Sequence, residues 1–148
     1  MKIRVELDSD LAEVEIVIRA ARFDAQLEQI QQALEQATAP PIIFYKGASE
    51  YFLDIDNILF FETDGSKIFA HTREDAYEVK HKLYELEDRL PYYFCRISKS
   101  SIINSKAIYS LEKSFSGSSS VRFYDTHKEV YVSRHYYQIL KEKLNEMR

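Results

Sequence analysis

The sequence is poor in the residues that staple or interrupt a fold. Its 148 residues include one cysteine, three glycines, three prolines and no tryptophan. The lone Cys95 cannot form an internal disulfide, which fits a reducing compartment. No apolar run approaches the roughly 18 to 20 residues of a membrane span, and MKIRVELDSD at the N-terminus lacks the apolar core of a signal peptide. We therefore expect a cytoplasmic chain with one globular domain and at most a small appendage.

Several motifs of catalysis are also missing. The four histidines are scattered, without the clustering that metal ligands need, and no GxxxxGK, GxGxxG or GxSxG pattern occurs. Asp54 and Asp56 in LDID are predicted to share a strand face, where a carboxylate pair could serve acid–base chemistry, although an exposed face is the commoner case. Cys95 is more typical of a buried strand than of a nucleophile. We expect no enzyme, cofactor, metal site or small-molecule substrate.

Charge is distributed unevenly along the chain. The total is −4, but residues 1–40 carry −4, residues 41–90 carry −5, and residues 91–148 carry +5 together with 11 serines. Such asymmetry suggests a polyanionic partner for the basic third. Composition alone favours an ordinary solvated surface over a binding site.

The first 40 residues are predicted to form a small ββα segment. Apolar and charged residues alternate over residues 1–8, and VEIVIRA at 14–20 predicts a second strand. From Phe23 the apolar residues recur every three or four positions, which predicts a helix that Asp24 favours at its start. TAPP at 38–41 breaks the chain. We interpret this segment as a candidate for packing or dimerisation, next to a domain at 41–148.

Residues 41–148 are predicted to be mainly β with short marginal helices. Short aromatic and β-branched segments separated by turn residues predict several small antiparallel sheets. These segments are IIFYK, YFLDI, NILFFE, KIFAH, AYEVK, YYFCRI, AIYSLEKSF, VRFYD and EVYVS. One helical pattern includes Val79 and runs to Leu90, where Pro91 stops it. A second covers residues 134–148.

Three donor-rich spots stand out: TDGSK at 63–67, RISKSS at 96–101 and SRH at 133–135. Lysine and arginine neutralise phosphates, and hydroxyl and amide donors position them. Ser133 is a good N-cap for the last helix, whose first free N–H groups attract anions. Turn and capping chemistry explains any one spot alone, but together they favour DNA. The aromatic residues are assigned to packing, and helix-turn-helix, zinc-finger and RNP signatures are absent.

The order of these elements resembles the LytTR DNA-binding domain of bacterial transcription regulators. The resemblance rests on ILFFE before a polar loop, on LEDRLP ahead of FCRISKSSIINSKAI, and on the closing VSRHYYQILKEKL. It runs from about residue 42 to the C-terminus. It implies antiparallel sheets with short helices, and promoter binding through loops that enter successive major grooves, typically at paired direct repeats in bent DNA. Many such proteins also carry a receiver domain, which 40 residues cannot form.

The resemblance implies which residues contact DNA. They are Ser66 and Lys67 in the first loop, Ser98, Lys99 and Ser100 in the second, and Arg134 in the third, with His135 beside it on the first helical turn. Lys99 falls at the principal base-reading position, and Arg134 matches an arginine of the family motif. Both side chains suit guanine acceptors in the major groove. Arg96 stays open, because it could instead pair with an acid inside the domain.

The sequence is compatible with two functions. The first is a sequence-specific transcription regulator that binds double-stranded promoter DNA, as a dimer or as two copies on tandem sites. The alternative is a protein-interaction module whose acidic N-terminal segment docks a membrane-protein or other regulatory partner. Preference for specific over scrambled DNA at about 150 mM salt would separate them, since weak non-specific binding is screened there.

Overall fold

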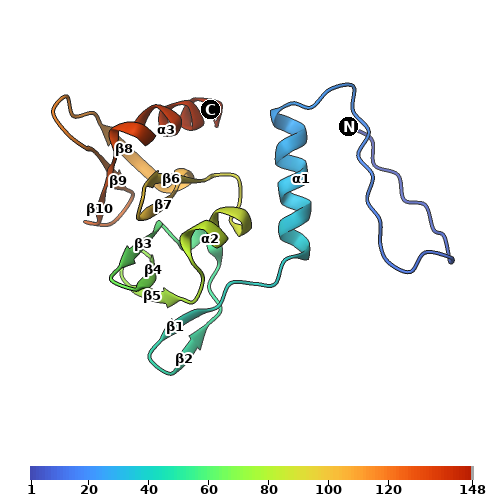
Figure 1. Ribbon diagram of the computed structural model, residues 1–148, viewed down its shortest axis with the longest axis horizontal. Coiled ribbons are helices and arrows are strands. Elements are labelled where there is room, and N and C mark those ends of the chain that lie inside the picture. The colour runs from blue at the N-terminus through green and yellow to red at the C-terminus, as the bar shows by residue number, and fades with distance from the viewer. Residues whose placement is uncertain (148) are drawn as a thin grey trace.

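The computed structural model describes residues 1–147 and divides into a β-rich body and an N-terminal part that α1 connects to it (Figure 1). The helices are α1 (Ala25–Thr38), α2 (Leu83–Arg89) and α3 (Arg134–Glu146). The strands are β1 (Phe44–Lys46), β2 (Ser49–Tyr51), β3 (Phe60–Asp64), β4 (Lys67–His71), β5 (Ala76–Val79), β6 (Phe94–Ser98), β7 (Ser101–Asn104), β8 (Ile108–Glu112), β9 (Ser119–Phe123) and β10 (Glu129–Val132).

The strands form two sheets in which every neighbouring pair is antiparallel. The larger sheet has the order β2-β1-β5-β4-β3-β7-β6, and the smaller has the order β10-β9-β8. The expected mainly β fold with antiparallel sheets and short helices is therefore confirmed. β3 lies between β4 and β7, so the β3–β4 turn and the β6–β7 turn lie next to each other at one end of the sheet.

The larger sheet is a central layer with a core on each face. Successive strand side chains point to opposite faces, so the neighbours Phe60 and Phe61 enter different cores, as do Ile102 and Ile103. One core is closed by α2 and the other by the smaller sheet and α3. This double packing makes the scaffold stiff where its strands meet at the turns.

The N-terminal part confirms the predicted helix but not the two predicted strands. Asp24 caps α1 by accepting a hydrogen bond of 2.9 Å from the Leu27 amide. Residues 1–8 and 14–20 contain no strand; they are extended arms joined by a turn in which the Leu11 amide donates to the Asp8 carbonyl at 3.3 Å. Alternation specifies the faces of a strand, whereas a strand also needs a backbone partner, and these arms have none within the chain.

The LDID stretch was also predicted wrongly as strand. β2 ends at Tyr51, and Ile55–Asn57 form one turn of 3₁₀ helix. The Asp54 side chain caps that turn by accepting from the Asp56 amide at 3.0 Å, and Tyr93 donates its hydroxyl to Asp56. The two carboxylates are therefore structural and have different partners: Asp54 binds a nearby backbone donor, as aspartate often does, and Asp56 binds a side-chain hydroxyl.

Other boundaries follow the sequence closely. β4 coincides with KIFAH, β10 falls within EVYVS, and Leu90 and Pro91 end α2 as expected. Val79 lies in β5 instead of in α2. Among the helices of residues 1–147, none has the length and apolar character that a membrane crossing needs. Over the same residues, no three His, Cys, Asp or Glu side chains gather as metal ligands.

Candidate nucleic-acid interface

The β3–β4 turn carries the first pair of candidate residues. Gly65 has φ of +63°, a left-handed conformation that glycine adopts without strain, so the hairpin can reverse tightly between Asp64 and Lys67. Ser66 and Lys67 are both exposed at its tip. The Lys67 Nζ lies 3.7 Å from Glu78 Oε1, so this cation is partly neutralised within the protein. Lys67 therefore has less free positive charge to offer a phosphate than a lysine without a carboxylate partner.

The β6–β7 turn lies directly beside the first turn. The Thr63 amide donates to the Ser100 carbonyl at 2.9 Å, which extends the pairing of β3 with β7 into the two turns. Ser98 Oγ accepts from the Ser100 amide at 3.2 Å and shapes the turn from inside. Lys99 and Ser100 are exposed, and Ser98 is half-buried. The turn therefore presents one lysine and one hydroxyl on a hydrogen-bonded frame.

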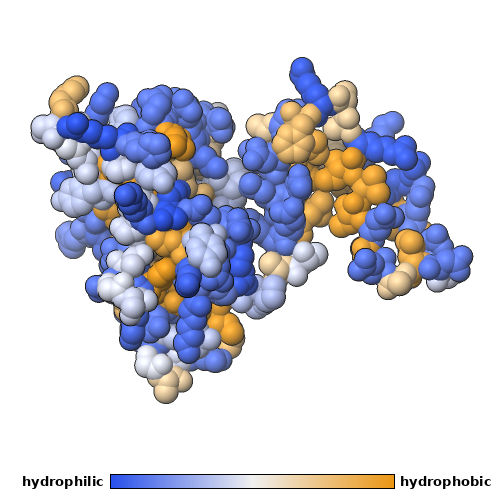
Figure 2. Space-filling view, viewed as in Figure 1, coloured by the Kyte–Doolittle hydropathy of each residue, from blue (hydrophilic) through white to orange (hydrophobic). Residues whose placement is uncertain are grey.

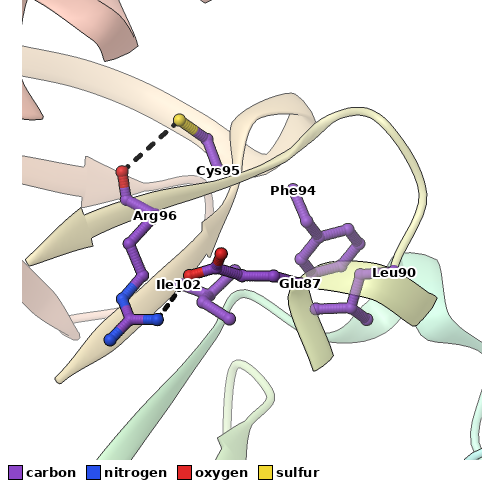
Figure 3. A pocket seen from close by; sticks show the side chains of 6 residues that line it. All are labelled: Glu87, Leu90, Phe94, Cys95, Arg96 and Ile102. Atoms are coloured by element: carbon purple, nitrogen blue, oxygen red, sulfur yellow. Dashed lines mark hydrogen bonds and ion pairs between the residues drawn. The ribbon is translucent and has the colours of Figure 1, made fainter. Parts of the chain in front are cut away.

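Arg96 holds this turn from below. Its Nε donates to the Ser98 carbonyl at 2.7 Å, and another guanidinium nitrogen donates to the Lys99 carbonyl. The remaining nitrogen forms an ion pair with Glu87 on α2, as Figure 3 shows. Arg96 therefore pairs inside the domain, which settles its role: it braces the turn and leaves Lys99 as the cation that faces outward.

The start of α3 lies against the same turn. The Ser133 amide donates to the Ile97 carbonyl at 3.0 Å, which fixes the β10–α3 junction beside the end of β6. Arg134 and His135 are exposed on the first helical turn. Ser133 is the N-cap residue as predicted, but its side chain makes no capping hydrogen bond and its hydroxyl oxygen is buried without a partner. Donors at this helix end are therefore not satisfied by the cap side chain.

A fourth loop, residues 113–118 between β8 and β9, emerges at the same end, and sequence analysis missed it. β8 and β10 both pair antiparallel with β9, so they run in the same direction. Both strands therefore end at the same end of the smaller sheet, where β10 leads into α3. Lys113 Nζ lies 5.4 Å from the ring centre of Tyr137 on α3. Phe115 is 91% exposed. The lysine and serines of this loop can be read from the sequence, but its position beside α3 follows only from the directions of the strands.

The structure thus brings all seven candidate residues to one end of the β-rich body. The backbone hydrogen bonds Thr63 to Ser100 and Ser133 to Ile97 connect the three sites in a row. Asp64 and Glu112 are the carboxylates nearest in sequence to these turns, and both are exposed. The structure also places Glu78 Oε1 3.7 Å from Lys67 Nζ and pairs Glu87 with Arg96, so the row is not free of acids.

The opposite end of the body contains a polar seam between the two sheets. Arg73 Nε donates to the Tyr124 carbonyl at 3.1 Å, and Lys128 Nζ donates to the Asp75 carbonyl at 2.6 Å. The same Lys128 nitrogen lies 3.2 Å from His71 Nδ1. Burial lowers the pKa of His71, and the Lys128 charge lowers it further, against the opposing effect of Glu62. The Lys128 contacts are part-buried and the Arg73 contact is exposed, and together they link the two sheets.

Cys95 is likewise structural. It is buried on β6, and burial raises the pKa of its thiol. A raised pKa disfavours the thiolate that nucleophilic chemistry needs. The predicted buried strand cysteine is confirmed. It lines a small pocket of about 230 Å³ between α2 and β6 that Glu87 and Arg96 close on one side (Figure 3).

The family model described as the LytTr DNA-binding domain matches residues 48–145. The chain belongs to the LytTr DNA-binding domain family. The matched residues include all four loops and turns described above. A solved LytTr DNA-binding domain from Bacillus cereus superimposes with a TM-score of 0.64 at 19% identity, covering 72% of this chain and 98% of that one. That likeness shows that the LytTr fold is shared.

Two curated relatives from Staphylococcus aureus match almost the whole chain. Relatives from strains RF122 and NCTC 8325 are 29% and 27% identical over 146 residues, covering 98% of this chain and 99% of each relative. Both are named uncharacterized HTH-type transcriptional regulators. Along residues 1–147 no two α-helices follow one another, so this LytTr chain has no helix-turn-helix. Family and relatives together support a DNA-binding regulator and not an enzyme.

Proposed function

We propose that the chain is a bacterial transcription regulator that reads promoter direct repeats through loops in the major groove. The observation that carries the proposal is the row of three turns at one end of the β-rich body, linked by the Thr63–Ser100 and Ser133–Ile97 hydrogen bonds. The LytTr family and the regulator names of the relatives support the same conclusion. The bacterial cytoplasm, where promoter DNA lies, is the expected location.

Each turn has a distinct role in the proposal. Lys99 and Arg134 read base edges, because long cationic donors suit the guanine acceptors of the major groove. The exposed hydroxyls of Ser66 and Ser100 contact phosphates and so position the DNA backbone, as hydroxyl donors do in most protein–DNA interfaces, while Ser98 acts on the same turn by shaping it. Lys67 adds charge, reduced by its contact with Glu78. His135 and the open helix end of α3 bind a phosphate. The backbone hydrogen bonds that connect the three turns support a common role for these groups.

The decisive experiment compares Arg134→Ala with Arg122→Ala on DNA from upstream of the protein's own gene. Arg122 is an exposed arginine near the end of β9 that lies away from the row, so it controls for the loss of one positive charge. Arg134→Ala should weaken specific binding by about 1 to 3 kcal/mol and relax the preference at one base position. Arg122→Ala should leave both unchanged.

Footprinting and fluorescence anisotropy on the same duplex would measure these effects. A protected region with two similarly oriented half-sites would support the reading of direct repeats. If Arg134→Ala binds specific DNA as tightly as the parent chain, the assignment of the third contact is wrong. If the parent chain does not distinguish specific from scrambled duplex at about 150 mM salt, the proposed function itself fails.

The alternative function gains no support from the comparisons. A protein-interaction module that docks a membrane or regulatory partner would leave the row of turns without a role. The relatives that match both the N-terminal part and the β-rich body are named as transcriptional regulators, not as adaptors. The N-terminal part therefore needs an explanation within a regulator.

A further inference from the structure

The N-terminal part exposes more large apolar side chains than a solitary domain tolerates. Nine of them lie within residues 3–23, among them Leu7 at 95% and Val14 at 89% exposure. Figure 2 shows hydrophobic side chains gathered beside α1 over the two arms. Large contiguous apolar patches on soluble proteins mark interaction surfaces. These side chains have no partner in the described part of the chain and form a candidate interaction surface.

The patch continues into a groove along α1. Ile16, Ile18 and Phe23 from the second arm face Leu27 and Leu34 of the helix around a hollow of about 340 Å³. α1 has no buried residue, which is unusual for an amphipathic helix whose apolar stripe normally faces a core. The helix and both arms therefore make one unfinished core.

Pairing of the two arms with each other is only partly complementary in charge. The turn at Asp8–Leu11 sets the register of such a hairpin. It would place Arg4 opposite Glu15, an attractive pair, but Glu6 opposite Glu13, a repulsive pair, and Lys2 opposite the uncharged Val17. Like charges directly opposite each other destabilise an antiparallel pair. In agreement, the arms carry no ladder hydrogen bonds in the structure.

Pairing of residues 2–8 with a second copy of themselves is complementary in charge. In an antiparallel arrangement centred on Val5, Lys2 faces the partner's Asp8 and Arg4 faces the partner's Glu6. The two-fold axis repeats both contacts, so four opposite-charge pairs form. Within one chain the Arg4 and Glu6 side chains already share a face, with their atoms 3.0 Å apart. All four charged residues therefore lie on one side of the shared ribbon.

We propose that the chain is a two-fold dimer in which residues 2–8 of two copies form an antiparallel ribbon centred on Val5. Ile3, Val5 and Leu7 of both copies then lie on the ribbon face opposite the charges. That face joins the apolar surface of the second arms and α1. The nine exposed side chains of each copy supply the contacts of a standard interface, which buries about 800 Å² per partner.

Charge-reversed chains test the proposal without DNA. An acidic chain carries Lys2→Glu and Arg4→Glu, and a basic chain carries Glu6→Lys and Asp8→Lys. Alone, each chain faces like charges across the ribbon, so its dimer affinity should fall on the order of 100-fold. Mixed one to one, they should form a heterodimer as tight as the parent dimer, because every opposing pair again has opposite signs.

Analytical ultracentrifugation measures the masses against the 17.5 kDa chain. The parent and the mixture should sediment at twice that mass, and the separate variants at the chain mass at the same concentration. Lys141→Glu, on the exposed face of α3, is the matched charge-reversal control and should remain dimeric. Circular dichroism checks that all chains keep the parent spectrum of the β-rich body.

Two results would overturn the inference. One is a parent chain that stays monomeric up to about 100 µM. The other is a mixture of acidic and basic chains that gives no heterodimer, which would mean that α1, the second arm or another protein covers the patch instead. Because no DNA is present, failure here leaves the proposed promoter binding untouched, and failure of DNA binding leaves this dimer untouched.

Discussion

At the residue scale, Arg96 decides how the second turn is presented. A guanidinium offers five donors in a planar fork, and here the fork reaches two carbonyls of the β6–β7 turn and the carboxylate of Glu87. Such contacts fix the turn before any ligand arrives. The sequence shows two nearby cations, Arg96 and Lys99, but not which of them faces outward. Strand alternation assigns a side chain to a face of the sheet but does not identify its partner.

Arg96→Met should therefore weaken DNA binding although it removes no outward-facing charge. Losing the fork frees the turn that carries Lys99, so affinity should drop about tenfold and the free energy of unfolding by about 1 to 2 kcal/mol. Fluorescence anisotropy and urea unfolding would measure the two effects. Glu87→Gln keeps the carbonyl contacts and should change affinity much less. Equal effects of the two substitutions would contradict the bracing role.

At the element scale, the two sheets are joined by the polar seam at the end away from the row of turns. His71 stacks on Phe60 with ring centres 4.3 Å apart, and its Nε2 lies 2.7 Å from Glu62 Oε1 without the alignment of a hydrogen bond. Lys128 faces its other nitrogen. Protonation would put a second cation against Lys128, so the seam favours the neutral ring.

The depressed pKa of His71 gives stability a pH dependence. The unfolded chain takes up a proton near the ordinary pKa of about 6.5, whereas the folded chain does so only at lower pH. Stability should therefore be full above pH 6.5 and fall as the pH drops below it. Urea unfolding at pH 7.5 and 5.5 would show the loss, and His71→Gln should reduce it. An unchanged pH dependence in His71→Gln would contradict this origin.

The elements also show what the sequence could predict. Strands with tight polar turns, such as β4, were predicted to the residue because alternation, turn signals and pairing all agree there. The arms at 1–8 and 14–20 have the same alternation but no partner within the chain. The strand prediction for LDID failed because the Asp54 side chain accepts from the Asp56 amide and caps a 3₁₀ turn there. Local pattern predicts a face, while pairing depends on the rest of the molecule.

The candidate site was predictable for a different reason. Cations and hydroxyls at TDGSK, RISKSS and SRH are unusual together, and the family resemblance ordered them. The loop at 113–118 was not predicted as part of the site, because its serine-rich stretch, SGSSS at 116–120, is equally typical of any turn. Only the shared direction of β8 and β10 places it beside Arg134. Loops that meet through strand direction cannot be recognised from spacing along the chain.

At the scale of the whole molecule, charge is segregated although the total is −4. The basic C-terminal third supplies Lys99, Lys113 and Arg134 at one end, while the acidic residues 1–40 belong to α1 and the arms. A protein of net negative charge can bind DNA when its field is organised in this way. Such binding depends on salt, because each neutralised phosphate releases counterions.

Lys113→Gln should change that salt dependence. If Lys113 meets a phosphate, its loss lowers the slope of log affinity against log salt by about 0.9 and weakens specific and scrambled duplex alike. Arg134→Ala should instead act mainly on the specific duplex. Anisotropy titrations at salt concentrations from about 50 to 300 mM would measure this slope for each variant and so separate the effects of Lys113→Gln and Arg134→Ala. A specific loss in Lys113→Gln would mean base contact.

The lack of strand pairing in the arms at 1–8 and 14–20 has one more consequence. Extended backbone without hydrogen-bonded neighbours fits readily into the active sites of proteases, and cleavage concentrates in such segments. A copy without a partner would be cut between residues 1 and 22 long before the β-rich body is attacked. At low concentration a protease would thus leave a shortened chain that keeps the three turns of the row but lacks residues 2–8, which form the proposed ribbon.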